Sequence, residues 1–241
     1  MIKNASPAMI IFRREVKSYF SSPIAYIVTG LFLLASGFLF FNTFFLINRA
    51  ELRQFFGLLP LVLSFFIPAL TMRLLAEEKR SGSYETLLTL PVTEAEIVAG
   101  KFLAAFVSGA VMLVPTLSYA VTCLVFGRPD AGPMLGGYLG ALFLIAAFSA
   151  VGLFASSLTK NQIIAFFIAL AVCVSLTLIS SFLIFMPSGV VAFFDFFSAS
   201  SHFDSVARGI IDLRDLLYFV SLTALFLALT VESLKSTGEA R

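Results

Sequence analysis

Six long apolar runs, none with a charged residue in its central portion, constrain this chain more than any other feature of its sequence. A helix needs about 20 mainly apolar residues to cross about 30 Å of hydrocarbon. Lipid offers the backbone no hydrogen-bond partners, so such runs are expected to be helical. β-barrel strands would alternate apolar and polar residues over about 10 positions, and these runs do not. The predicted spans are roughly Ile24–Ile47, Phe55–Leu75, Phe102–Phe126, Met134–Leu158, Ile163–Met186 and Leu216–Leu234.

The composition excludes a soluble fold. Hydrophobic residues make up 59% of the 241 residues and charged residues 12%, whereas a soluble domain has about 45–50% apolar and about 25% charged residues. A soluble protein of this composition would need an exterior made largely of Leu, Phe and Ala. The sequence therefore predicts an all-α integral membrane protein with six transmembrane helices. Pro60, Pro68 and Pro115 are expected to kink the second and third.

The basic residues predict the orientation, because Lys and Arg concentrate in cytoplasmic loops. With the N-terminus in the cytoplasm, 11 of the 16 basic residues, including every lysine, lie inside. The five outside are Arg49, Arg53, Arg128, Arg208 and Arg214. An even number of spans then leaves both termini in the cytoplasm.

The first 23 residues precede the spans and carry a helical pattern of their own. Ser6 followed by Pro7 is a typical helix start, with Ser as the N-cap and Pro at the first helical position. The pattern predicts residues 1–23 as an amphipathic helix on the cytoplasmic membrane surface and residues 24–241 as a six-helix transmembrane domain. A solvated basic tail is the alternative. In the amphipathic interpretation the apolar face contains Met9, Phe12, Val16, Tyr19 and Phe20, and the polar face contains Arg13, Arg14, Lys17 and Ser21.

The outer connection at about 187–215 is longer than the other connections and partly apolar. It is too interrupted to span the membrane twice and too apolar to stay in water, so short helices dipping into the outer leaflet and shielded by protein are expected. His202 lies in this segment near Asp195 and Asp204, where local structure or solvation is favoured over a metal or acid–base site. The apolar residues are Val190, Val191, Phe193, Phe194, Phe196 and Phe197.

The connection between the second and third spans contains a candidate functional element. A charged turn at 77–80 ends the apolar run, and Gly82 interrupts the helix. Ser83 can cap a new short helix, which Pro91 ends. Thr93 and Glu96 form a capping box for the next helix.

One face of that short helix is apolar, because Tyr84, Leu87 and Leu88 fall together with Glu85 beside them. An exposed apolar face next to charge is typical of a docking surface for a partner. An ordinary interfacial helix resting on lipid headgroups fits the pattern equally well.

Three segments carry recognisable motifs. Residues 77–92 read Glu-Glu-Lys-Arg-Ser-Gly-Ser-Tyr-Glu-Thr-Leu-Leu-Thr-Leu-Pro-Val, and residues 156–162 read Ser-Ser-Leu-Thr-Lys-Asn-Gln. Residues 202–215 begin His-Phe-Asp and precede the last span. Together they resemble the two cytoplasmic connections of ABC-2-type ABC transporter permeases and the segment that precedes their last transmembrane helix. The resemblance covers nearly the whole chain and is nearest to the gliding-motility-type and nitrous-oxide-reductase-maturation-type permeases.

The resemblance implies a type V exporter-like architecture with an N-terminal connector helix, a short cytoplasmic coupling helix and a partly re-entrant outer segment. A separate cytoplasmic ABC ATPase, in two copies, would hold ATP and Mg²⁺ and contact this chain. The implied contacts are Glu77, Glu78, Gly82, Ser83, Tyr84, Glu85, Thr86, Leu87, Leu88 and Pro91 in the coupling helix, Thr159, Lys160, Asn161 and Gln162 in a second contact, and Phe12, Arg13, Arg14, Val16 and Lys17 in the connector helix.

The resemblance further implies a permease subunit that pairs with a second copy or a different permease in the bacterial cytoplasmic (inner) membrane, with no role for nucleic acid. Export is favoured, and the cargo is not predicted. The chain is not expected to be an enzyme, since it lacks a Gly-x-x-x-x-Gly-Lys-Ser/Thr loop for ATP. No catalytic, cofactor-binding or metal-binding residues are predicted in it.

Two other classes of function stay open from the residues alone. An ion-coupled secondary carrier or a channel without an ATPase partner usually needs ionisable residues or broken helices at mid-membrane depth. No predicted span has a central charge. A membrane enzyme or scaffold is disfavoured because no reactive cluster is apparent.

Overall fold

The computed structural model describes residues 6–47, 51–84, 91–127, 129–182, 194–210 and 212–239, and these contain helices and no strand. The all-α fold class is confirmed. The helices are α1 (Pro7–Ser21), α2 (Pro23–Ile47), α3 (Arg53–Thr71), α4 (Ala76–Ser81), α6 (Glu94–Leu113), the 3-10 turn η1 (Val114–Thr116), α7 (Leu117–Phe126), α8 (Ala131–Ser157), α9 (Gln162–Phe182), α11 (Ala199–Ala207) and α12 (Leu213–Glu239).

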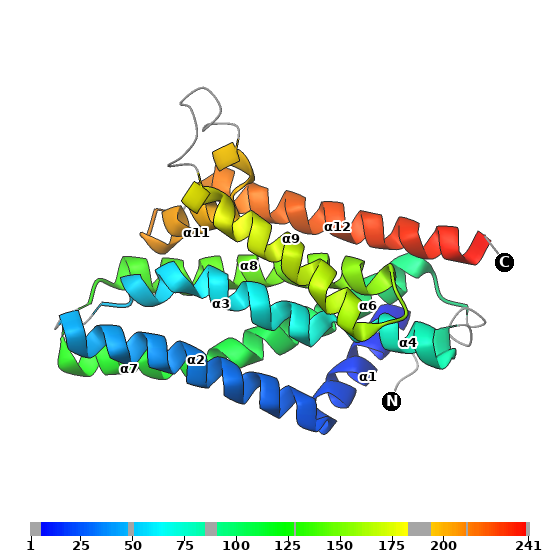
Figure 1. Cartoon of the computed structure of the whole chain (residues 1–241), viewed down its shortest axis with the longest axis horizontal. Coiled ribbons are helices and arrows are strands. Elements are labelled where there is room, and N and C mark those ends of the chain that lie inside the picture. The colour runs from blue at the N-terminus through cyan, green and yellow to red at the C-terminus, as the bar shows by residue number, and fades with distance from the viewer. Residues whose placement is uncertain are drawn as a thin grey trace.

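Six helical segments in the described residues are long and apolar enough to cross a membrane, which confirms the predicted number of spans. They run broadly along the long axis of the molecule (Figure 1). Pro115 lies in η1, where the third span changes from α6 to α7, while Pro60 and Pro68 lie inside α3. The segments are Pro23–Asn42, Arg53–Ser81, Glu94–Phe126, Ala131–Leu158, Gln162–Phe182 and Leu213–Ser236.

α8 occupies the centre of the bundle and packs against α3, α6, α9, α11 and α12. In its most apolar stretch 72% of the residues are buried, against 22% in α9 and 17% in α12. Glycine allows this close packing: a β-carbon at Gly152 would overlap the Thr71 hydroxyl and lie 2.8 Å from the Thr71 Cβ. Apolar side chains on α2, α9 and α12 point outward, as expected for helices that face lipid.

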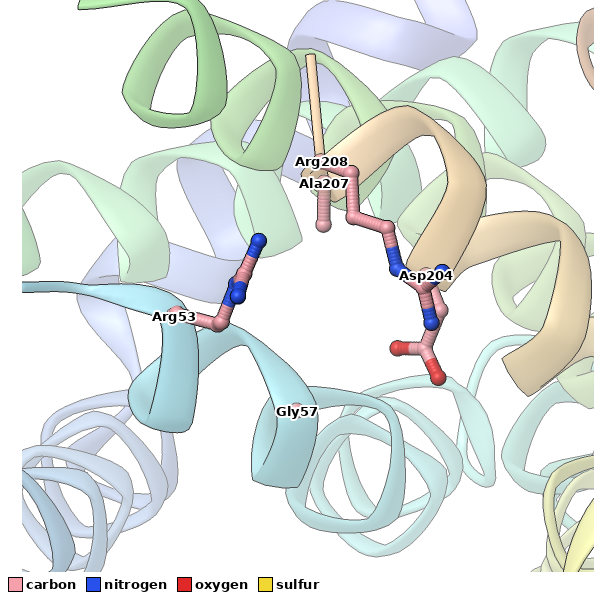
Figure 2. A pocket seen from close by; sticks show the side chains of 5 residues that line it. All are labelled: Arg53, Gly57, Asp204, Ala207 and Arg208. Carbon is pink, nitrogen blue, oxygen red and sulfur yellow. The ribbon is translucent and has the colours of Figure 1, made fainter. Parts of the chain in front are cut away.

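The two ends of the bundle differ in character. α1, α4 and the end of α12 lie at one end, here called the α4 end, so both ends of the chain lie on the same side (Figure 1). α11 and the starts of α3 and α8 lie at the opposite end, called the α11 end. There, Arg53 and Arg208 face a common cavity (Figure 2).

His202 has a structural role at the α11 end, as the sequence favoured, but with a different aspartate. Its Nδ1 lies 2.6 Å from Oδ1 of Asp215, and its Nε2 lies 3.1 Å from the carbonyl oxygen of Phe196. The imidazole stacks on the Tyr218 ring at 4.2 Å between centroids. These contacts fix α11 to the first turn of α12. Residues 194–197 are also helical, whereas Val190, Val191 and Phe193 lie outside the described residues.

Candidate functional site

The candidate site is the α4 end, where the connection between the second and third spans begins with α4. α4 ends at Gly82, whose φ of +75° is a left-handed conformation that glycine adopts without strain. The predicted interruption at Gly82 is confirmed. Ser83 and Tyr84 are helical again, with the Ser81 and Ser83 hydroxyls 2.7 Å apart. Glu85, Thr86, Leu87 and Leu88 lie outside the described residues.

α6 begins with the capping box that the sequence predicts. The Thr93 hydroxyl accepts from the Glu96 backbone N–H at 3.3 Å, and the Glu96 carboxylate accepts from the Thr93 N–H at 3.0 Å. The segment between Gly82 and Thr93 therefore has a defined joint at each end. Pro91, just before the second joint, is exposed.

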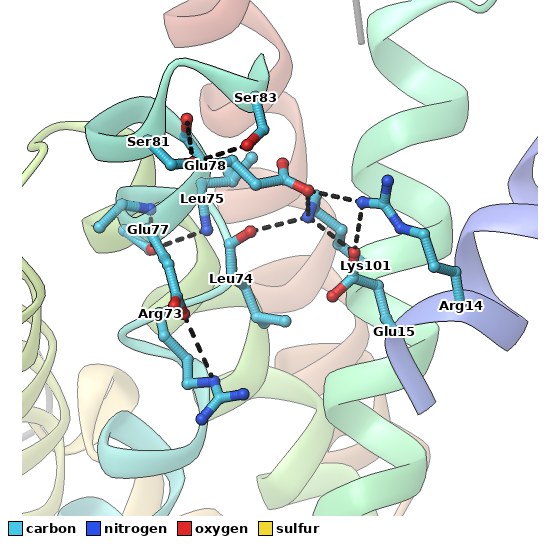
Figure 3. A network of polar contacts seen from close by, with 12 residues as sticks. Arg14, Glu15, Arg73, Leu74, Leu75, Glu77, Glu78, Ser81, Ser83 and Lys101 are labelled. Carbon is cyan, nitrogen blue, oxygen red and sulfur yellow. Dashed lines mark hydrogen bonds and ion pairs between the residues drawn. The ribbon is translucent and has the colours of Figure 1, made fainter. Parts of the chain in front are cut away.

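A buried ion cluster joins α1, α4 and α6 (Figure 3). The ammonium of Lys101 on α6 donates to Glu15 at 3.1 Å, to Glu78 at 2.9 Å and to the Leu74 carbonyl at 2.7 Å. All three of its N–H donors thus have a partner. Arg14 on α1 donates to the same two carboxylates, at 2.8 Å to Glu15 and 2.6 Å to Glu78.

The cluster is electrically balanced, with two cationic and two carboxylate side chains. The Lys101 side chain is 0% exposed and the two carboxylates are each 15% exposed. Burial opposes ionisation of Glu15, but Lys101 and Arg14 outweigh it and lower the pKa of this carboxyl. The Arg14 side chain is 53% exposed. Removing the fully buried Lys101 would therefore be far more costly than losing an exposed pair, because the carboxylates would lose their buried partner.

α1 packs directly along α6. The predicted amphipathic helix therefore buries part of its apolar face against another helix of this chain. Ile11 and Ile97 form a small apolar core between the two helices. A β-carbon at Gly100 would lie 2.7 Å from the Ala8 carbonyl oxygen and 3.0 Å from the Ile11 side chain. Among the predicted connector residues, Phe12 and Val16 are partly buried, Arg13 and Lys17 are exposed, and Arg14 enters the ion cluster.

The α4 helix is also fixed to the end of α8. The Ser156 hydroxyl accepts from the backbone N–H groups of Leu75 and Ala76 at 3.0 and 2.9 Å and donates to the Met72 carbonyl at 2.9 Å. It thereby satisfies two N–H groups at the start of α4, which have no partner within that helix. Lys79 adds a bond to the carbonyl oxygen of Ser157.

Tyr84 anchors the start of the segment between Gly82 and Thr93, which is called the coupling segment below after the role predicted for it. It is 3% exposed and packs with Leu75, Val98, Leu153 and Leu234. Two of the three predicted acidic contacts lie in the described residues, and they diverge. Glu78 turns inward to the ion cluster, whereas the Glu77 side chain is 55% exposed and lies 3.8 Å from Arg73.

The second predicted contact is the turn between α8 and α9. The Asn161 carboxamide oxygen accepts from the Ile163 N–H at 2.9 Å, and the Thr159 hydroxyl accepts from the Asn161 N–H at 3.1 Å. Lys160 and Asn161 are exposed, while Thr159 and Gln162 are partly buried. α4 and α9 are in contact, so both predicted contact regions lie at the same end of the bundle.

Three residues that organise this site are absent from the predicted contacts: Glu15, Lys101 and Ser156. Lys101 was the available signal in the sequence. It lies in the first turns of an otherwise apolar span, and a buried ammonium group needs hydrogen-bond acceptors from the surrounding protein. Its partners come from 23 to 86 residues away, so local pattern could not identify them. Within the described ranges, no group of three or more His, Cys, Asp or Glu residues could hold a metal ion.

Comparison with known proteins agrees with this architecture. The family described as "ABC-2 family transporter protein" matches residues 48–231. The chain is 29% identical over 186 residues to "Probable multidrug ABC transporter permease YbhS" of Escherichia coli K12, and equally to the protein of that name in E. coli O157:H7. The matched region is 75% of this chain and 45% of each relative, so the chain spans about half the length of these curated relatives.

The match covers three of the elements that build the site, namely α4, α6 and the turn after α8, and all or most of five of the six candidate spans. The six apolar helices identify a multi-pass membrane protein. The chain belongs to the ABC-2 transporter family.

Proposed function

We propose that this chain is the permease subunit of an ATP-driven exporter, and that force from a separate cytoplasmic ATPase enters it at the α4 end. The observation that carries this proposal is the buried Lys101, which binds Glu15 of α1, Glu78 of α4 and the Leu74 carbonyl at once. A displacement of the coupling segment would therefore move α1, α4 and α6 as one unit.

The movement would continue into other spans through side-chain contacts. Ser156 connects α4 to α8, and the Ser157 hydroxyl lies 3.1 Å from that of Ser233 on α12. Packed elements of this kind change position as rigid bodies rather than deforming continuously. Two states of the ATPase that contact the segment differently would shift the balance between two arrangements of the spans.

The residues proposed to contact the ATPase fall into two groups. Glu77, Ser83 and Pro91 are exposed around the coupling segment, and Lys160 and Asn161 are exposed on the neighbouring turn. Glu78 and Tyr84 instead hold the segment in place from inside this chain. Glu85, Thr86, Leu87 and Leu88 stay predicted contacts from the sequence.

The orientation, direction and assembly belong to the same proposal. Among the described residues, most of the basic side chains lie at the α4 end, which supports a cytoplasmic location for it and for both termini, in the bacterial inner membrane. The name of the E. coli relative refers to multidrug transport, which supports export. We further propose a dimer of permease subunits with two ATPase copies; the comparisons reach the ABC-2 family, and the narrower subgroup remains a prediction.

Co-purification tests the ATPase contact. The tagged chain should retain an ABC ATPase encoded beside its gene and raise its ATP hydrolysis, while Glu85→Arg and Leu87→Asp should abolish both effects. Gln54→Arg is the matched control for Glu85→Arg. Gln54 is exposed at the α11 end, so the substitution adds an arginine far from the proposed contact. Normal assembly and hydrolysis with both site variants would refute the proposed docking segment.

Direction of transport needs a separate measurement. In inside-out membrane vesicles, an exporter accumulates its substrate in the lumen when ATP is added outside. A panel of fluorescent cationic drugs, motivated by the relative's name, should accumulate with wild type and not with Leu87→Asp. ATP-driven depletion of dye preloaded into such vesicles would instead establish import.

A further inference from the structure

The α11 end contains a cavity with a charge pattern that the proposed coupling mechanism does not use. Its volume is about 300 Å³, and its described lining is Arg53, Gly57, Asp204, Ala207 and Arg208. This volume lies at the lower end of the range of about 300–1,000 Å³ for small-molecule sites. It suits a small polar headgroup and is too small for a lipid with its acyl chains.

Two helical pairs form the walls of this cavity. Arg53 and Gly57 are four residues apart at the start of α3, and Asp204 and Arg208 are four residues apart at the end of α11, so each pair shares one helix face. Figure 2 shows Arg208 on the same side as Asp204, with Arg53 across the opening. α3 and α11 are in contact, which holds the two pairs opposite each other.

The lining has unmatched positive charge. Within the described part of the chain, neither Arg53 nor Arg208 forms an ion pair or a side-chain hydrogen bond. Burial raises the pKa of Asp204 although Arg208 acts to lower it, so this carboxyl is partly desolvated in the cavity wall. Two guanidinium groups and one carboxyl group thus face a shared space.

The position favours a ligand that belongs to a membrane surface. Arg53 is the first residue of a candidate span, and Arg208 lies five residues before the start of another at Leu213. Ile210, Leu213 and Leu217 follow Arg208 in sequence and are each more than half exposed. Charged groups and exposed apolar side chains are therefore adjacent where a headgroup meets the hydrocarbon.

We propose that this cavity binds a phosphate ester that also carries an ammonium group, which is the headgroup chemistry of an ethanolamine phospholipid. The phosphate would lie between Arg53 and Arg208, since guanidinium groups donate paired hydrogen bonds to phosphate oxygens. The ammonium would lie at Asp204. A neighbouring cavity of about 210 Å³ shares Arg53 but is also lined by Glu51 and Asp130, whose carboxylates would repel a phosphate.

Native mass spectrometry of the purified, delipidated full chain tests this site. The titrants are palmitoyl-oleoyl phosphatidylethanolamine, the phosphatidylglycerol with the same acyl chains, and water-soluble glycerophosphoethanolamine. We expect phosphatidylethanolamine to bind the wild type, and Arg53→Gln with Arg208→Gln to weaken it at least about tenfold, because two charge-assisted contacts are lost. Arg214→Gln is the matched control, since Arg214 is exposed at the same end and lies over the Phe196 ring.

Two further variants separate specific recognition of the ethanolamine headgroup from the effect of removing positive charge from the cavity. Asp204→Asn should remove the preference for phosphatidylethanolamine over phosphatidylglycerol. Gly57→Leu should fill the cavity without changing its charge, because a β-carbon there meets no atom within 4 Å. Gly30→Leu is its control, since Gly30 also faces open space, in α2.

The outcomes are distinct. Competition by glycerophosphoethanolamine at equal affinity would support the same chemistry but assign the ligand to solution instead of the bilayer. The proposal is overturned if the double arginine variant and Gly57→Leu bind phosphatidylethanolamine as well as their controls do. Thermal unfolding midpoints close to wild type for Gly57→Leu would establish that its loss of binding is not a loss of fold.

Discussion

The ammonium of Lys101 lies 2.9 Å from Glu78, a residue 23 positions earlier in the chain and across the joint between two candidate spans. This pair, with Glu15 on its other side, connects the start of the third span to the segment that follows the second. The predictions below test how much the fold and its coupling segment depend on contacts of this kind.

Lys101→Met should destabilise the protein strongly. It leaves the two mostly buried carboxylates with Arg14, whose side chain is 53% exposed, as their remaining cation, and breaking a buried ion pair typically costs about 3–5 kcal/mol. The measurement is unfolding in mixed detergent micelles, followed by circular dichroism. Lys235→Met, at an exposed position of α12, should have little effect. Adding Glu15→Gln and Glu78→Gln to Lys101→Met should recover part of the loss, and no recovery would argue against charge imbalance as the cause.

Acid should weaken the contact between α1 and the rest of the bundle. Lys101 and Arg14 outweigh the burial of Glu15 and lower its pKa below the ordinary value of 4.5. The stabilisation from Glu15 is therefore complete above pH 4.5 and is lost as the pH falls through the lower, folded-state pKa. Thermal unfolding midpoints between pH 7 and pH 3 should fall more steeply for wild type than for Glu15→Gln. Parallel curves would show that Glu15 contributes nothing to the acid response.

Ser156→Ala should loosen the start of α4. The N–H groups of Leu75 and Ala76 and the Met72 carbonyl lose the Ser156 hydroxyl at once, and a buried polar group without a partner costs about 1–3 kcal/mol. Hydrogen exchange should become faster at Leu75 and Ala76 specifically. Ser118→Ala is the control, because the exposed Ser118 hydroxyl donates to the Pro115 carbonyl three residues earlier and to no other group among the described residues.

Gly152→Ala should be poorly tolerated, since its methyl group would overlap the Thr71 hydroxyl. Overpacking a well-filled core typically costs about 1–3 kcal/mol. Gly30→Ala, where the β-carbon faces open space, should be neutral or stabilising. Thr71→Ala combined with Gly152→Ala should recover part of the lost stability, because it removes the hydroxyl overlap but leaves the Cβ of residue 71 at 2.8 Å. Thermal unfolding of wild type, the two single variants and the double variant gives the comparison. A double variant no more stable than Gly152→Ala would contradict the packing explanation.

The sequence predicted the elements of the fold well because each depends on local chemistry. The number of spans follows from the number of long apolar runs without a central charge. The start of α6 follows from the Thr93–Glu96 capping box, and the end of α4 follows from Gly82. The predicted coupling segment is bounded in the sequence by Gly82 and Pro91, and most of it lies outside the described residues. What it contacts beyond this chain remains a prediction.

The tertiary contacts were less accessible to sequence reasoning. Glu15 lies among basic residues and so reads as part of a solvated face, yet it points toward Lys101, 86 positions away. His202 was associated with Asp195 and Asp204 by proximity in sequence, while the bundle brings it to Asp215. In both cases a buried polar group takes its partner from another helix, which no local pattern specifies.

The central position of α8 limits where a cargo can pass. Among the described residues, α3, α6, α9, α11 and α12 pack against this helix, and its glycines allow close approach. For the permease proposed above, we therefore expect the middle of one subunit to be filled by packed helices. A route for a transported molecule would therefore follow the outer surface of the bundle, with a second subunit or lipid forming the opposite wall. Substrate selectivity would then reside on the periphery, where α2, α9 and α12 present their apolar side chains.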